Sequence, residues 1–268
     1  MPKTNGGRKH VVVTGIGAVT PIGIGKDSCW ENALNGTSGA GAISHFDHTN
    51  CPVHFACEVK GFQPLDWIEP KKAARLDRFV QFALTASIMA VEDAGIDFQK
   101  TDQKRCGVVF GTGIGGQMTN ETQCSQVRNI GPKGVAIHTI PALLPNAASA
   151  HIAIHFGLRG LCYGTVTACA SAAHALALAL KHIQNGEADV IIAGGSEAAI
   201  TELTTAAFAK LKAISLRNDD PERASKPFDK DRDGFVLGEG SAAVVLESLD
   251  HAEQRGAKVY ANFLGASM

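Results

Sequence analysis

The chain alternates short apolar runs with longer amphipathic segments, and glycine or proline stands at many of the junctions. Runs rich in β-branched residues predict buried strands, whereas apolar residues that recur every three or four positions predict helices. The pattern predicts strands at 10–14, 106–110, 189–193, 235–247 and 259–264, and in the residues that lead up to Cys169. It predicts helices at 26–34, 71–94, 117–128, 146–156, 202–214 and 249–255, and another directly after Cys169.

Strands that alternate with helices predict an α/β protein in which helices cover both faces of a mostly parallel sheet. Residues 1–9 are expected to form a disordered leader, and residues 10–268 are expected to form a single domain. Residues 35–64 break the periodicity and are rich in Gly, Pro and His, so we expect a long loop there. The helix after Cys169 is apolar nearly all round, which predicts burial on every side.

Cys169 stands where a predicted strand passes into a predicted helix, and its neighbours Ala168, Ala170 and Ser171 are small. A tight strand-to-helix turn tolerates only small neighbours and points the side chain of the turn residue outward, as in a nucleophile elbow. The N-terminus of a helix also favours negative charge, and the thiolate is the reactive form of cysteine. The pattern therefore indicates a nucleophilic Cys169, with a buried structural cysteine as the alternative.

Composition narrows the setting of this chemistry. Of the 268 residues, 45% are apolar, and the formal net charge of −1 gives no bulk attraction to nucleic acid. The chain has seven cysteines and no CxxC pair, which argues against zinc ribbons and favours free thiols in a reducing compartment. No apolar run reaches the length of a membrane span. We therefore expect a soluble, cytoplasmic protein that binds no metal, no nucleic acid and no membrane.

Two motifs suggest ligands that the surrounding sequence does not support. The stretch 111–116 matches the GxGxxG dinucleotide fingerprint, but the residues after it are a poor helix opening, so we interpret it as a tight turn beside a pocket. The run 229–234 resembles a calcium loop, but Gly240 stands where its bidentate glutamate should be. We expect those carboxylates to pair with Lys226, Arg232 or backbone N–H groups.

Several stretches, taken together and in order, resemble the β-ketoacyl-acyl-carrier-protein synthases, and specifically the elongating type II condensing enzymes of fatty acid synthesis. They include Thr-Ala-Cys-Ala-Ser at 167–171 and Ala-Gly-Gly-Ser-Glu at 193–197. The other matching stretches are 11–17, 111–116, 157–160 and 227–240, so the similarity covers nearly the whole chain. The resemblance implies a thiolase-like layered fold, of which this chain is the first of two pseudo-symmetric halves.

The resemblance implies a decarboxylative Claisen condensation without a cofactor. An acyl chain moves from its carrier protein to Cys169 as a thioester, and the carbanion formed by decarboxylation of malonyl carrier protein attacks that thioester. Cysteine suits this chemistry because it is both a soft nucleophile and a tolerable leaving group. By resemblance, the N–H of Cys169 is one oxyanion donor, and Gly113 and Ile114 line the acyl pocket. The segment 140–146 matches one that packs near the pocket of a partner in a homodimer.

The acyl carrier protein is acidic, so its docking face on the enzyme should be basic. The cluster Lys71, Lys72 and Arg75 fits this expectation, together with Lys133 and Lys212. Without the resemblance, an ordinary solvated helix start explains the cluster equally well.

The main departure from the family concerns its second half, which supplies two catalytic His, a Lys and the N–H of a Phe. The chain stops at Met268, about where the first half ends, and His174, His182 and His251 lie outside the family's histidine motifs. His174 is interpreted as a core histidine. Alone, the chain is expected to condense poorly and to expose the surface that packs against the second half. The alternatives are a non-catalytic or truncated condensing-enzyme subunit, and a thiolase that acts on coenzyme A esters.

Overall fold

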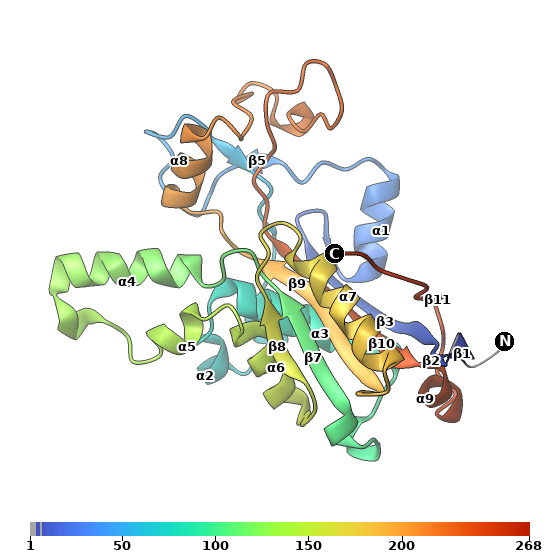
Figure 1. The fold of residues 1–268 in the computed structure, drawn as a ribbon. Helices are drawn as coiled ribbons and strands as arrows, with labels where there is room; N and C mark the ends of the chain where they lie inside the picture. The colour runs from blue at the N-terminus through green and yellow to red at the C-terminus, as the bar shows by residue number, and fades with distance from the viewer. Residues whose placement is uncertain (1–3, 6) are drawn as a thin grey trace.

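A mixed β-sheet forms the centre of the computed structural model, which describes residues 4–5 and 7–268 (Figure 1). Within that described part, seven strands join one sheet in the order β11-β3-β10-β9-β7-β8, with β4 beside β3. These strands are β3 (Val11–Thr20), β4 (Gly23–Ile24), β7 (Cys106–Gly111), β8 (Cys162–Thr165), β9 (Val190–Glu197), β10 (Gly240–Ser248) and β11 (Ala261–Asn262). The α/β class expected from alternating strands and helices is confirmed.

Strand direction divides this sheet into two parts. β7 runs parallel to β8 and β9, whereas β10 is antiparallel to β9 and β3, and β11 is antiparallel to β3. The mixed sheet that the sequence predicted is thus confirmed, but parallel pairing is confined to the side of the sheet nearest Cys169 instead of predominating. Hydrophobic periodicity identifies a buried strand but not its direction, because direction depends on how the connections cross the sheet.

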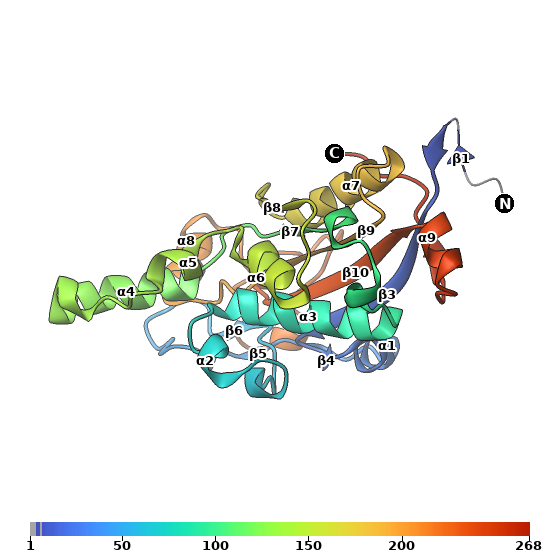
Figure 2. The ribbon, with the colours of Figure 1, turned by 90° about the horizontal axis from the view of Figure 1, so that it is seen from below.

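Helices cover both faces of the sheet, and Figure 2 shows the resulting layers. α3 (Arg78–Ala94) and α6 (Ala147–Phe156) pack on one face, and α7 (Ser171–Gln184) packs on the other. The side chains of β7 alternate accordingly, since Val108 joins the cluster of α3 and Val109 joins the cluster of α7. Successive side chains of a strand point to opposite faces, so one strand serves both hydrophobic clusters.

The helix that follows Cys169 is buried mainly on its sheet-facing side. Ala175, Ala179 and Ile183 of α7 are fully buried, whereas Leu176 and Leu178 are only half-buried by the residues that the structure describes. The prediction of burial on every side is therefore wrong for this part of the chain.

The segment 71–94, predicted as one amphipathic helix, is two helices. α2 (Pro70–Ala73) ends before Asp77, whose extended backbone and carboxylate cap the start of α3. The carboxylate accepts a hydrogen bond from Phe79 N at 3.2 Å. A capping Asp offers the first N–H groups of a helix an acceptor, so the chain turns at this residue instead of continuing from α2.

Two glycines allow α3 to lie directly on β3. A Cβ at Gly15 would lie 2.0 Å from the carbonyl oxygen of Ala90, and a Cβ at Gly17 would lie 2.0 Å from that of Ala86. Helix and strand therefore pack backbone against backbone, an approach that any side chain at these positions would prevent.

The remaining elements surround this core. β1 (Thr4–Asn5) pairs with β2 (Arg8–Lys9) where a disordered leader was expected, and residues 1–3 and 6 lie outside the described residues. Within the long loop 35–64, β5 (Gly41–Ala42) pairs with β6 (Phe55–Ala56). The other α-helices are α1 (Lys26–Leu34), α4 (Gln117–Ile130), α5 (Thr139–Leu143), α8 (Glu202–Lys210) and α9 (Leu249–Gln254).

Element boundaries differ most from the predicted ones near the C-terminal part of the sequence. The helix predicted at 202–214 ends at Lys210, and the strand predicted at 235–247 begins only at Gly240. The strand predicted at 259–264 is reduced to β11. No helix in the described part of the chain combines the length and the apolar character that a membrane span requires.

A buried carboxylate ties β10 to the segment that follows it. The side chain of Glu247 has no exposed surface, and it accepts hydrogen bonds from Arg255 Nε at 3.0 Å and from the Thr14 hydroxyl. His251 Nδ1 lies 2.5 Å from Glu247 Oε2. Burial alone would raise the pKa of Glu247, but the hydrogen bonds from Arg255, His251 and Thr14 outweigh it and lower the pKa to about 2.

Replacing Glu247 by Gln should lower the free energy of unfolding by about 3 kcal/mol at pH 7 and by roughly half as much at pH 3. The folded pKa lies below the unfolded value of about 4.3, so this contribution is complete above that pH and is lost as the pH falls towards about 2. Urea unfolding from pH 7 to pH 3 measures the difference, with the exposed Glu222→Gln as control. An equal loss at every pH would show that the charge of Glu247 is not the cause.

Candidate active site

A cavity of about 620 Å³ opens where the carboxyl ends of β7 and β9 meet the turn that holds Cys169. Ile114, Phe208 and Leu237 give it apolar walls, and Glu197 adds a polar group beside them. An apolar cavity with a few convergent polar groups is the usual form of a small-molecule site. The ends of parallel strands are also where ligands bind in open α/β sheets.

The backbone around Cys169 forms the sharp strand-to-helix turn that the sequence predicted. β8 ends at Thr165 and α7 begins at Ser171, and between them Ala168 adopts a left-handed conformation with φ 51°. A left-handed residue with a side chain costs roughly 1–3 kcal/mol, so the surrounding contacts must hold it in place. Cys169 therefore stands just before the first helical turn, with its side chain exposed at the cavity.

Ser171 fastens this turn to its surroundings. Its hydroxyl accepts a hydrogen bond from Thr167 N at 2.9 Å, and it lies 2.6 Å from the carbonyl oxygen of Ala168 and 2.9 Å from that of Thr112. The Thr165 hydroxyl in turn donates to the carbonyl oxygen of Ser171 at 2.8 Å. One small side chain thus joins the cysteine turn to the turn that follows β7.

Glycines bring the start of α7 into contact with the sheet. A Cβ at Gly111 would lie 2.4 Å from the backbone carbonyl of Ser171, and a Cβ at Gly195 would lie 2.5 Å from the Cβ of Ala172. Both glycines stand in motifs that carried the family resemblance. Their role here is close packing, because no side chain fits between the two strands and the helix.

The GxGxxG stretch at 111–116 is followed at once by α4, so the expectation of a poor helix opening there is wrong. The backbone N–H groups of Gly113 and Ile114 nevertheless donate to Glu197 Oε2, at 2.7 and 3.1 Å. A dinucleotide site needs such N–H groups free for phosphate. The geometry supports the interpretation of this stretch as a turn beside a pocket.

Of the seven cysteines, all described and all free, Cys169 is the one that lines this cavity. Cys106 is buried in the sheet, and burial raises the pKa of its thiol. Cys162 is exposed on β8, but partial burial of its sulfur raises the pKa of that thiol too. Exposure at the cavity thus distinguishes Cys169 from the other six cysteines.

The predicted docking residues come from three separate parts of the chain. Lys71 and Lys72 lie in α2 and Arg75 follows it, whereas Lys133 follows α4 and Lys212 follows α8. In Figure 1, α8 lies above α4 and α2 lies below it. Burial lowers the pKa of Lys72, so this lysine is a less accessible charge than its neighbours.

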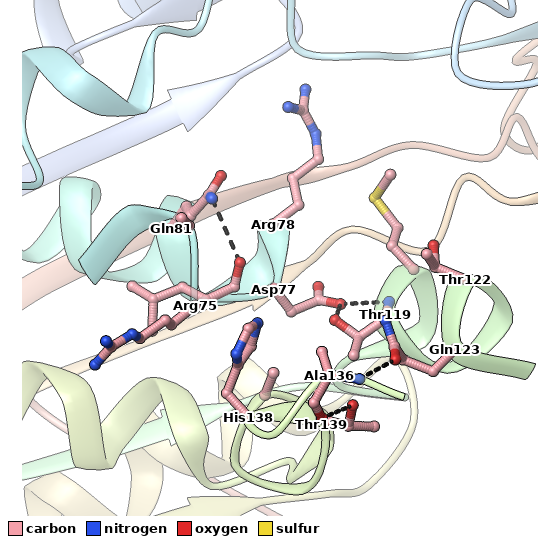
Figure 3. Close-up of a pocket in the computed structure, with 14 residues that line it drawn as sticks. Arg75, Asp77, Arg78, Gln81, Thr119, Thr122, Gln123, Ala136, His138 and Thr139 are labelled. Atoms are coloured by element: carbon pink, nitrogen blue, oxygen red, sulfur yellow. Dashed lines mark hydrogen bonds between the residues drawn. The ribbon is translucent and has the colours of Figure 1, made fainter. Parts of the chain in front are cut away.

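A second cavity, of about 240 Å³, lies beside Arg75 between the starts of α3 and α4 (Figure 3). Asp77 accepts hydrogen bonds there from Thr119 N at 2.8 Å and from the Thr119 hydroxyl at 2.6 Å. Burial raises the pKa of Asp77 despite these donors. The carboxylate of Asp77 thus links α3 to α4 through its hydrogen bonds. We assign this cavity no part in the chemistry at Cys169.

The aspartates of the calcium-like run are used within their own loop. Asp229 accepts a hydrogen bond from Asp231 N at 2.7 Å, and Asp233 lies 3.4 Å from Arg217 Nε. The predicted pairing with backbone N–H groups is found, but the cationic partner is Arg217, which lies outside the run. Among the described residues, no group of three or more His, Cys, Asp or Glu side chains is placed to hold a metal ion.

Sequence reasoning missed the roles of Ser171, Glu197 and Thr112. Ser171 and Glu197 stand in stretches that were quoted for the resemblance, but only their spatial contacts reveal what they do. Burial raises the pKa of Glu197, although the N–H groups of the turn after β7 act against this rise. The roles of these three residues are recognisable only once the ends of β7, β8 and β9 are placed side by side.

The sheet order, the layers and the cysteine turn at an apolar cavity define a thiolase-like α/β protein. The family can be stated more closely. A family model described as Beta-ketoacyl synthase, N-terminal domain, matches residues 8–252, and the chain belongs to this family. The resemblance inferred from the motifs is confirmed.

Relatives with assigned names agree with this family. The chain is 44% identical over 261 residues to the 3-oxoacyl-acyl-carrier-protein synthase 2 of Synechocystis sp., an alignment that covers 97% of this chain and 63% of the relative. It is 42% identical over 261 residues to the protein of the same name from Vibrio cholerae, with the same shares covered, 97% and 63%. The chain therefore spans less than two thirds of the length of these relatives.

Solved structures agree as well. The ishigamide ketosynthase/chain length factor has a TM-score of 0.88 and 31% identity, over 96% of this chain and 63% of that chain. A type II PKS acyl-carrier protein in complex with its ketosynthase bound to the hexaketide has a TM-score of 0.84 and 32% identity, over 95% of this chain and 62% of that chain. The thiolase-like ketosynthase fold is thereby confirmed.

Replacing Ser171 by Ala should lower the free energy of unfolding by about 1 kcal/mol, because it removes a buried hydroxyl that accepts a hydrogen bond from Thr167 N and lies 2.9 Å from the carbonyl oxygen of Thr112. We also expect faster hydrogen exchange at that amide. Urea unfolding and amide exchange measure the two effects. Ser125→Ala, on the exposed part of α4, is the control and should stay within about 0.5 kcal/mol. Unchanged exchange at Thr167 in Ser171→Ala would contradict the role given to this hydroxyl.

Proposed function

We propose that this protein takes part in fatty acid elongation as a 3-oxoacyl-acyl-carrier-protein synthase, with Cys169 as the residue that accepts the acyl group. The observation that carries the proposal is the exposed thiol of Cys169 in a strand-to-helix turn at an apolar cavity of about 620 Å³. The named relatives support the reaction type, because both are 3-oxoacyl-acyl-carrier-protein synthases.

The reaction proceeds in two transfers. The thiolate of Cys169 attacks the carbonyl of an acyl-carrier-protein thioester, an acyl–sulfur bond forms, and the carrier thiol leaves. Malonyl carrier protein then loses carbon dioxide, its carbanion attacks the acyl-Cys169 carbonyl, and the cysteine sulfur leaves as thiolate. Both transfers pass through a tetrahedral oxyanion, which the N–H of Cys169 stabilises. Ile114 and Phe208 line the cavity that receives the apolar chain.

The residues that act on malonyl carrier protein belong, in this proposal, to a second half of the enzyme. Leu176 and Leu178 of α7 are both only half-buried and so support such a partner, since apolar surface is normally covered. A homodimer is supported by Ile140 and Leu144, which are 64% and 46% exposed on the segment matched to a partner's pocket. Seven free thiols favour a reducing, cytoplasmic setting.

The two rival functions differ in what they require of this site. A non-catalytic subunit does not need an exposed cysteine at the cavity, so Cys169 argues against it. A thiolase would accept coenzyme A esters, whereas the basic residues of α2 favour an acidic carrier protein. Comparing acyl transfer from carrier protein and from coenzyme A therefore separates the second rival from the synthase.

Cys169→Ala should lower chain elongation by roughly a thousandfold or more in protein expressed from the full gene, because the acyl-accepting sulfur is gone. The formation of 3-oxoacyl carrier protein from acyl and malonyl carrier proteins is the measurement. Cys124→Ala removes an exposed thiol on α4 and should retain the parental rate. Elongation that survives in Cys169→Ala would refute the proposed function.

Changing Lys71, Lys72 and Arg75 together to Glu should weaken binding of acyl carrier protein by roughly tenfold or more at low salt. The change replaces attraction to an acidic partner by repulsion, so the salt dependence of the dissociation constant should fall as well. Calorimetric titration at two ionic strengths measures both. Changing the exposed Lys100 and Lys104 to Glu, which reverses two charges instead of three, is the control. Equal affinities for the two variants would remove the α2 cluster from the docking surface.

A further inference from the structure

The carboxylate of Glu197 holds the turn that forms one wall of the acyl cavity. Glu197 is the last residue of β9, and its Oε2 accepts hydrogen bonds from Gly113 N at 2.7 Å and Ile114 N at 3.1 Å. Its Oε1 accepts a hydrogen bond from the Thr112 hydroxyl at 3.1 Å. Three consecutive residues of the turn after β7 are thereby fixed to one side chain of the neighbouring strand.

Thr112 connects this turn to two further groups. Its hydroxyl accepts a hydrogen bond from Gly115 N at 3.1 Å, so the far end of the turn is fixed as well. Its carbonyl oxygen lies 2.9 Å from the hydroxyl of Ser171, which also bonds the backbone beside Cys169. The cavity wall and the cysteine turn are therefore parts of one hydrogen-bonded unit.

The carboxylate of Glu197 fills the space beside the Cα of Gly113. A Cβ at this residue would lie 2.8 Å from Glu197 Oε2, closer than real Cβ atoms come to their neighbours. The carboxylate thus occupies the position that a side chain at residue 113 would need. Burial of a charged group beside an apolar cavity is unfavourable unless the group is fully hydrogen-bonded. A glutamate without a role in holding the turn would therefore be unexpected at position 197.

We propose that Glu197, acting through the backbone of Gly113 and Ile114 and the hydroxyl of Thr112, is a positioning residue that fixes the cavity wall against which long acyl chains lie. This inference rests on the proposed function for its substrate class. Glu197 itself forms no bond to the acyl group. Without the Glu197 carboxylate, the turn after β7 is no longer held in place and the cavity wall at Ile114 shifts. Cys169 then loses its preference for long apolar chains over short ones.

The chain offers conservative and disruptive changes at two points of this unit. Glu197→Gln keeps an oxygen for the two N–H groups, and Thr112→Ser keeps the hydroxyl. Glu197→Ala removes the acceptor, and Thr112→Val removes the hydroxyl while it keeps the branched shape. A role in positioning predicts that the effect follows the hydrogen bonds, so that Gln and Ser restore what Ala and Val lose.

Alkylation of Cys169 measures this preference without any carrier protein. In protein from the full gene, the rate constants for iodoacetamide and for N-dodecyl iodoacetamide are obtained from the mass of the peptide that contains Cys169. The sulfur–carbon bond forms, the carbon–iodine bond breaks, iodide leaves and the thiol proton passes to solvent. The readout is the ratio of the long-chain to the short-chain rate constant, with Cys124 as an internal reference on exposed α4.

We expect this ratio at Cys169 to fall at least fivefold in Glu197→Ala and in Thr112→Val, and to return to within twofold of the parent in Glu197→Gln and Thr112→Ser. An unchanged ratio in a folded Ala or Val variant, or equal slowing with both reagents, would overturn the proposal. If Glu197→Ala fails to fold, Thr112→Val decides the question. A changed ratio in an enzyme that takes no acyl group from carrier protein would support the positioning role and refute the proposed function.

Discussion

The close approach of α7 to the ends of β7 and β9 is the constraint on which the rest of the site depends. Gly111 and Gly195 permit it, because side chains at either position would collide with Ser171 or Ala172. The approach brings the Ser171 hydroxyl within reach of both the cysteine turn and the turn after β7. Those bonds in turn hold the left-handed backbone of Ala168, which places Cys169 at the cavity.

Much of the fold could be predicted from the sequence, because it depends on local patterns. Apolar periodicity located most of the helices and strands, and small residues around Cys169 indicated the tight turn. Other features depend on contacts between distant residues. One such feature is the antiparallel direction of β10. Another is the break between α2 and α3 at Asp77, whose carboxylate also accepts a hydrogen bond from Thr119 of α4. A third is the incomplete burial of Leu176 and Leu178 on α7. No window of sequence contains both partners, so periodicity could not reveal them.

The site was predictable to a similar extent. A cysteine among small residues was visible as a candidate, and its motif pointed to a family. The interpretation of the GxGxxG stretch as a turn beside a pocket agrees with the structure. The reason could not be seen in the sequence, because the N–H groups that a phosphate would need donate to Glu197, which is distant in the sequence. The basic residues show the limit of reading charge from sequence. Lys212 follows α8 and does not belong to the same element as Lys71 and Lys72, and burial lowers the pKa of Lys72.

Acyl transfer to Cys169 is tested most directly by locating the acyl group after the protein, expressed from its full gene, has been mixed with a long-chain acyl carrier protein. Mass spectrometry of proteolytic peptides identifies the modified residue, and cleavage by neutral hydroxylamine identifies a thioester. We predict a hydroxylamine-sensitive acyl mass on the peptide that contains Cys169. An acyl group on another residue, or a carrier protein that keeps its acyl chain, would contradict this function.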